Sequence, residues 1–161
     1  MEMNYLILLA AALLPMIIGF IWYNPKVFGN VWMKAADMTE EKMKGANMVL
    51  VFGLSYLFSI ILASALMGIV IHQWGVFSLV GGNPEVLNSG TAADFMAEYG
   101  TNFRTFKHGL LHGVIAGFTL ALPILATNAM FERKGFKYIA VNAGYWIVTM
   151  GLMGGVICQF M

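Results

Sequence analysis

The chain has 161 residues, of which 60% are hydrophobic and 11% are charged, and its formal net charge is +1. Soluble domains are about 45–50% apolar and about 25% charged. A single domain of this length cannot bury so many apolar side chains and still cover itself with polar ones. The composition therefore excludes an ordinary soluble enzyme, a disordered chain and a disulfide-stapled domain. The charge balance provides no basic surface for a nucleic acid partner, and we expect an integral membrane protein.

Four stretches are apolar enough to cross the hydrocarbon core of a bilayer, which takes about 20 residues of helix. They cover residues 5–22, 48–74, 108–130 and 138–160, and none of them contains Asp, Glu, Lys or Arg. The sequence thus predicts one domain over residues 1–161, with an all-α fold built as a bundle of four transmembrane helices. Charge-free spans argue against proton- or cation-coupled transport, which normally uses an intramembrane acid.

The loop between the first two spans has a helical pattern of its own. Phe28, Val31, Trp32 and Ala35 recur at the spacing of one helical face, which predicts a short helix lying at the membrane interface, either as a lipid contact or as a plain connector. Thr39, followed by two glutamates, has the pattern of an N-cap. We expect a second helix to begin there and to continue into the second span.

The outer loop, residues 75–105, is long for a connector. Thr91 and Asp94 form a variant of the capping box, and Gly100 is a typical helix end. Phe95 and Tyr99 share a face of the helix between them. This pattern predicts a small helical lid over the outer ends of the spans.

The basic residues give the orientation. Seven of the nine Lys and Arg residues lie in the first loop or in the turn between the third and fourth spans. Because short cytoplasmic loops are enriched in Lys and Arg, we expect those two segments inside, and both termini and residues 75–105 outside.

Small residues mark the faces that pack. The third span carries a doubled GxxxG pattern and the fourth carries a single one, which predicts a tight hairpin of these spans and self-association of the chain through small-residue faces. Asn128 and Asn142 are expected at similar depth, where their amides can hydrogen bond across the hairpin. Pro15 and Pro123 should kink the first and third spans. The glycines of the pattern are Gly109, Gly113, Gly117, Gly151 and Gly155.

One segment resembles a known family. Trp22-Tyr23-Asn24-Pro25, followed by Phe28-Gly29 and Trp32-Met33-Lys34, is similar to the small bacterial membrane proteins that share a domain of unknown function, the family numbered 1761. Residues 128–133 and 142–145 also look like that family. The resemblance implies a four-helix protein of the bacterial inner membrane with no assigned activity, and it transfers no catalytic residue.

The three histidines, His72, His108 and His112, all fall toward the outer side. His108 and His112 are spaced i, i+4, which places both imidazoles on one helix face, as in many transition-metal sites. Arg104 precedes them at the same spacing. Three interpretations stay open: a structural polar cluster, an anion or polar-ligand site made by Arg104, Lys107, His108 and His112, or a metal or haem site made by the three histidines with an oxygen from Asp94 or Glu98.

The sequence therefore supports two functional hypotheses. The first is a non-enzymatic protein without a cofactor that contacts membrane lipid, forms homo-oligomers and binds or passes a small polar or anionic solute near the outer side. The second is a metal- or haem-binding membrane redox protein that uses His108 and His112. No catalytic residue can be named for either hypothesis.

Overall fold

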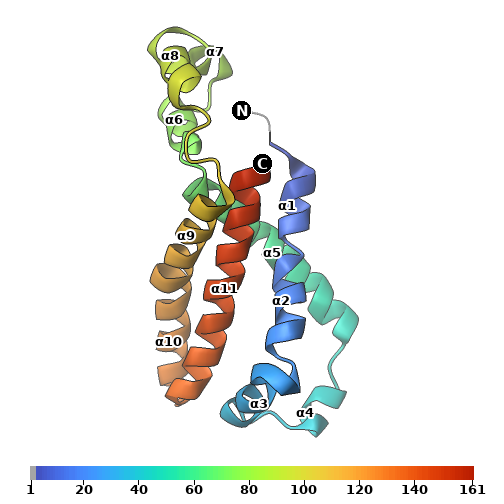
Figure 1. The fold of residues 1–161 in the computed structure, drawn as a ribbon. Helices are drawn as coiled ribbons and strands as arrows, with labels where there is room; N and C mark the ends of the chain where they lie inside the picture. The colour runs from blue at the N-terminus through green and yellow to red at the C-terminus, as the bar shows by residue number, and fades with distance from the viewer. Residues whose placement is uncertain (1–2) are drawn as a thin grey trace.

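The computed structural model describes residues 3–161, and in this part of the chain the regular elements are helices without strands. Four helical stretches are long and apolar enough to cross a membrane: Tyr5–Trp22, Met48–Val70, Phe106–Phe131 and Phe136–Phe160. Three of them stand roughly upright and α5 crosses obliquely, with α3 and α4 at one end of the bundle and α6–α8 at the other (Figure 1). Both chain ends lie at the end that carries α6–α8. These helices indicate a membrane protein.

Proline breaks the first span, as expected. Asn4 caps α1 (Tyr5–Ala11) by accepting a hydrogen bond from the Ile7 N–H, and α2 (Leu14–Trp22) begins with Pro15 at its second position. A proline has no N–H and its ring collides with the carbonyl four residues earlier, here that of Ala11. The helix therefore ends at Ala11 and restarts two residues beyond Ala12.

The second span is shorter than predicted. Helix α5 (Met48–Val70) ends four residues before the expected end at residue 74, because Ile71 is extended and His72 lies in the turn before α6 (Gln73–Leu79). Thr39 caps α4 (Glu40–Lys44) through the Lys42 N–H, as predicted. The expectation that this helix continues into the second span is wrong, since α4 ends at Gly45 and Asn47 starts α5 with a cap of its own.

The third span also changes its winding near its proline. It consists of α9 (Phe106–Ala116), the π-helical turn η2 (Gly117–Ala121) and α10 (Leu122–Phe131), with Pro123 at the second position of α10. A π-turn is a known way to relieve a broken i→i−4 bond within a helix. The fourth span, α11 (Phe136–Phe160), lies at the centre of the bundle. Of the residues in its most apolar stretch 61% are buried, whereas in the corresponding stretch of α5 17% are buried.

The first loop folds back on the end of α2. Asn24 caps η1 (Pro25–Gly29), which leads into α3 (Asn30–Ala36). Gly29 is buried, and a Cβ at this position would overlap the carbonyl oxygen of Tyr23. The ring of Trp32 lies 5.4 Å from that of Tyr23. These contacts explain in physical terms why a glycine follows Phe28 in this segment.

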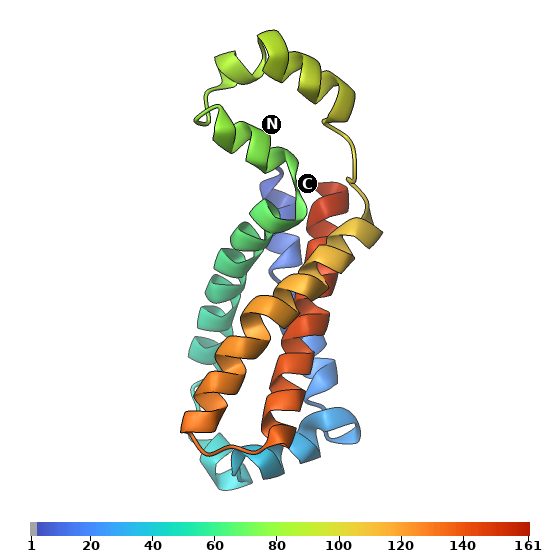
Figure 2. The same cartoon turned by 90° about the vertical axis from the view of Figure 1, so that its left-hand side faces the viewer.

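The outer loop forms three short helices above the bundle: α6, α7 (Pro84–Leu87) and α8 (Gly90–Tyr99). Figure 2 shows them as an arc over the ends of the spans. Helix α8 follows Ser89 rather than starting at Thr91, and it ends at Gly100 as predicted. Buried Gln73 anchors the arc, because its Nε2 donates to the carbonyls of Tyr99 (3.3 Å) and Asn102 (2.9 Å).

Candidate metal centre

Close packing of α9 on α11 positions the histidines. A Cβ on Gly109 would overlap the carbonyl oxygen of Gly154, and one on Gly113 would overlap that of Met150. Gly117 faces the backbone of Ile147. Such contacts require glycine, because any side chain would push the two backbones apart. The glycine face of the third span is therefore buried inside one chain.

The glycines of α11 pack in a different arrangement from the one the pattern suggested. Gly151 contacts the side chain of Val114, and Gly155 contacts the ring of Phe106. The glycine that packs against the backbone of Gly109 is Gly154, which the sequence pattern did not include. Self-association of the chain would therefore have to use another surface.

Three imidazoles converge where α5, α9 and the start of α6 meet. The candidate ligand nitrogens of His72, His108 and His112 all lie within 4.8 Å of one another. The His108 and His112 rings are 4.4 Å apart, and the His72 ring is 4.8 Å from each of them and nearly perpendicular to both. His72 joins the group because α5 ends at Val70 and the chain turns there.

His108 is the constrained member of the group. Its backbone N–H donates to the hydroxyl of Thr105, the N-cap of α9. Its side-chain Nε2 is buried and has no hydrogen-bond partner among residues 3–161. Phe103, at a positive φ of 62°, brings its ring to 5.2 Å from His108. Buried polar atoms nearly always have a partner. Among the described residues the exceptions are this nitrogen, the Gln73 Oε1 and the Thr149 Oγ1, and only the nitrogen belongs to the histidine group.

Phe103 could not be found from the sequence. It lies in an irregular turn, where no periodic pattern marks a residue whose ring packs beside a site.

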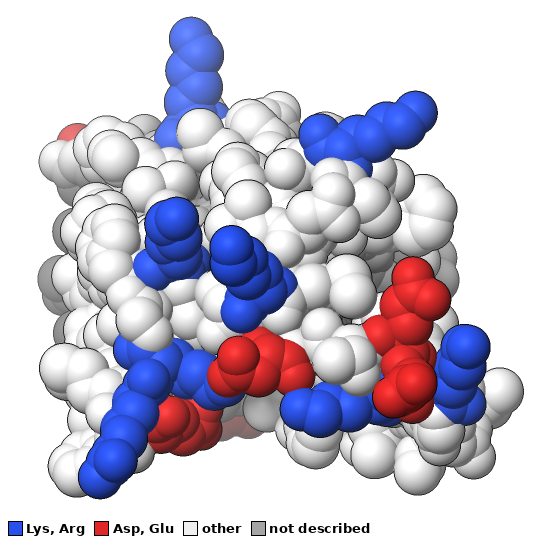
Figure 3. All heavy atoms as spheres, turned by 90° about the horizontal axis from the view of Figure 1, so that it is seen from below, with Lys and Arg blue, Asp and Glu red and all other residues white. Residues whose placement is uncertain are grey.

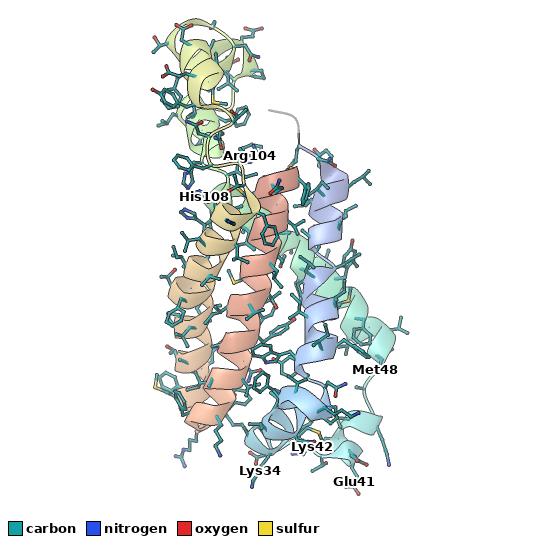
Figure 4. All side chains as sticks on the ribbon, in the orientation of Figure 1. Lys34, Glu41, Lys42, Met48, Arg104 and His108 are labelled. Carbon is teal, nitrogen blue, oxygen red and sulfur yellow. The ribbon has the colours of Figure 1, made fainter. Side chains whose placement is uncertain are left out.

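The predicted stripe of Arg104, His108 and His112 on one helix face does not form. Arg104 precedes α9, and its Nε donates to the carbonyl oxygen of Cys158 at 3.1 Å, near the end of α11 (Figure 4). That position suits a cation, because a helix C-terminus carries partial negative charge. Lys107 is exposed on α9. Neither cation belongs to the histidine group.

The acidic residues of the arc lie between His72 and His108 in the sequence, but they are not among the candidate metal ligands. Residues 73–103 contain Glu85, Asp94 and Glu98 and no Lys or Arg. Asp94 and Glu98 are exposed on α8, and the group of candidate ligands consists of the histidines alone. The acids give the arc a negative charge without contributing a ligand.

Cys158 is a buried link beside this centre. Its thiol is 3.3 Å from the carbonyl oxygens of both Val70 and Phe103, the two segments that deliver His72 and His108. We expect it to hold those segments together.

The predicted amide pair between Asn128 and Asn142 is replaced by another contact. The Asn142 Oδ1 accepts from the Tyr23 hydroxyl at 3.0 Å, and its Nδ2 donates to the Tyr138 carbonyl at 2.8 Å. Asn128 is exposed on α10. Similar depth in a bilayer does not bring two side chains together, because they must also point the same way around their helices.

Comparison with known proteins places the chain in a family. The family model described as "Protein of unknown function (DUF1761)" matches residues 6–158. The chain belongs to this family. The match covers the second and third spans in full, nearly all of the first and fourth, the arc and the three histidines. No curated protein and no solved structure matches the chain.

Proposed function

We propose that this DUF1761 protein binds one divalent transition-metal ion through His72, His108 and His112. The observation that carries this proposal is the convergence of three imidazoles, one of which, His108, has a buried nitrogen without a partner in the described part of the chain. Imidazole is a common ligand of zinc, copper, iron and nickel. A bound ion would satisfy the buried nitrogen, which otherwise stays desolvated at a free-energy cost.

The separations suit a single ion. Two nitrogens bound to one tetrahedral zinc ion, at about 2.0–2.1 Å each, lie about 3.4 Å apart. Nitrogens within 4.8 Å of one another would have to approach by about 1.4 Å at most to reach that geometry. Three protein ligands leave a fourth position open, and exposed His72 places that position toward solvent.

A single ion fits better than a haem. Two axial ligands of a haem lie on opposite faces of the porphyrin, whereas His108 and His112 are on one face of one helix with rings 4.4 Å apart. An anion also fits less well, because Arg104 is engaged with the Cys158 carbonyl. The acidic arc over the site favours a cation by raising its local concentration.

We place the centre on the outer side of a bacterial inner membrane. The opposite end of the bundle carries the seven basic residues that favour the cytoplasm. Binding of extracytoplasmic metal is the role that these features support.

Metal titration tests the proposal. The protein, purified in detergent without a polyhistidine tag, should bind one Co²⁺ with the visible absorption of a tetrahedral site and should exchange it for Zn²⁺. His108→Gln or His112→Gln should weaken Zn²⁺ binding at least tenfold in calorimetry, because each removes one of three ligands.

Lys107→Gln is the matched control, since Lys107 is exposed at the same end of α9 and lies outside the group. It should bind Zn²⁺ like the unchanged protein. Absence of stoichiometric binding, or equal binding by the histidine variants, would show that the proposal is wrong.

A further inference from the structure

A large apolar crevice opens between α2 and α5, in the half of the bundle remote from the histidines. Its volume is about 1260 Å³, and its walls come from α2, α5 and α11. Pockets for drug-sized ligands measure about 300–1,000 Å³, so this crevice has room for a larger apolar molecule. Figure 1 shows that α5 diverges from α2 in the direction of the N-terminus of α5.

Packing explains why the helices diverge. Helix α2 is held on α11, because the Tyr145 hydroxyl donates to the Pro15 carbonyl (2.7 Å) and the Trp22 Nε1 donates to the Val141 carbonyl (3.1 Å). In the other half of the bundle α1 packs against α5, and Ala11 of α1 and Ala63 of α5 are fully buried there. The first two turns of α5 are packed less closely, since residues 48–55 are all exposed.

The crevice spans one leaflet of a bilayer. Its lining runs from Pro15 to Tyr23 on the first span and from Leu62 to Met48 on α5. These stretches measure about 12 Å and about 21 Å of helix, against about 15 Å for half of the hydrocarbon core. A spanning helix from a second copy would contact the bundle through its full thickness. An acyl chain occupies one leaflet only.

Polar side chains lie at one end of the crevice. The hydroxyl of Tyr23 and the amide of Asn142 meet there at 3.0 Å, beside Asn24 and the indole of Trp32. Tyr and Trp are the residues that favour the level of lipid headgroups. Deeper in the crevice, the Ser59 hydroxyl bonds to the Ser55 carbonyl of its own helix, so the walls there are apolar. This gradient matches an amphiphile with its polar end outward.

The charge at that end is positive. The two loop segments at this end carry seven Lys and Arg residues against four Asp and Glu residues, and Figure 3 shows the basic side chains spread over the face. Lys26 follows Pro25 of the lining and Lys44 precedes Met48 by four residues; both are exposed. Lys34 and Lys42 lie below the splayed start of α5 at Met48 (Figure 4). A negative headgroup complements this end.

We propose that the crevice binds an anionic phospholipid of the leaflet on the basic side. The acyl chains fill the space between α2 and α5, and the phosphate group lies at the end that carries Lys26 and Lys44. Lipid then supplies the packing that α5 lacks in its first half.

Native mass spectrometry of the delipidated protein tests this site, with palmitoyl-oleoyl phosphatidylglycerol and the matching phosphatidylcholine as probes. The unchanged protein should retain phosphatidylglycerol at least tenfold better than phosphatidylcholine. Ser55→Phe should abolish this retention by filling the crevice from an exposed position. Ser64→Phe, exposed on the same helix but outside the lining, should leave it unchanged.

A second variant tests the charge. Lys26→Gln with Lys44→Gln should weaken phosphatidylglycerol binding about fivefold for each lysine removed, and Lys107→Gln at the opposite end should have no effect. Three results would overturn the proposal: equal retention of both lipids, retention unaffected by Ser55→Phe, or a lipid-free dimer that Ser55→Phe dissociates. The last would identify a second copy as the occupant.

Discussion

Single residues decide how closely the two central helices approach. Gly109, Gly113 and Gly154 let the backbones of α9 and α11 touch, and the sequence pattern predicted two of these three. It missed Gly154 because the GxxxG spacing selected Gly151, three positions before it, and Gly155, the next residue. The spacing therefore identifies a close approach, but the exact register depends on side chains of the partner helix, such as Val114 and Phe106.

Gly109→Ala should destabilise the bundle by about 1–3 kcal/mol, as expected for an overpacked contact, and should lower the thermal unfolding midpoint in detergent by several degrees. The Cβ has no space because it would overlap backbone, which cannot rotate away. Gly68→Ala is the control, since Gly68 is in helix α5 and a Cβ there meets nothing within 4 Å. Equal midpoints for both variants would contradict this account of the packing.

Whole elements were predictable where composition alone determines them. The four spans follow from long charge-free runs, and Thr39 and Gly100 mark helix ends through local capping. The break at residues 71–72 was not predictable, because it lies inside the long apolar run of the second span. The break at residues 45–47 does carry local signals, since Gly45 is a typical helix end and Asn47 a typical N-cap. The crevice also could not be predicted from the sequence, since it depends on the angle between α2 and α5. The histidine group, by contrast, follows from helical spacing and a shared end of the bundle.

One ion pair ties two elements at the basic end. Asp37 ends α3 in the left-handed region (φ 54°), and its carboxylate lies 2.7 Å from the Lys134 Nζ, in the turn before α11. The hydrogen bond from Lys134 and its charge lower the pKa of Asp37, and the same hydrogen bond raises the pKa of Lys134. An acid whose pKa is lower in the folded state stabilises the fold at pH values above the pKa it has in the unfolded chain. This contribution is lost as the pH falls through the pKa of the folded state.

We therefore expect hydrogen exchange in residues 30–38, after correction for the intrinsic rate, to increase as the pH falls below about 4, the ordinary range of an aspartate. The effect should be small and local, because the pair is at the surface. Asp37→Asn should show the faster exchange already at neutral pH and no further acid transition in this segment. An identical acid transition in Asp37→Asn would assign it to another group.

At the scale of the whole molecule, the two ends of the bundle differ in chemistry. One end carries seven basic residues and the proposed lipid crevice, while the other carries the acidic arc, both chain ends and the three histidines. A bilayer distinguishes these ends, because basic segments stay in the cytoplasm and anionic headgroups attract them. The same asymmetry supports an inner-leaflet lipid and an extracytoplasmic metal ion.

Labelling of single cysteines tests this orientation. Cys158 is buried, so the unchanged protein should react little with a membrane-impermeant maleimide. Thr91→Cys, exposed on α8, should be labelled in intact cells, whereas Glu41→Cys, exposed on α4, should be labelled only after the membrane is permeabilised. The reverse pattern would place the histidines in the cytoplasm, and equal labelling of both in intact cells would mean that the chain inserts in two directions. Either result would remove the basis for an extracytoplasmic metal site while leaving the metal titration itself unaffected.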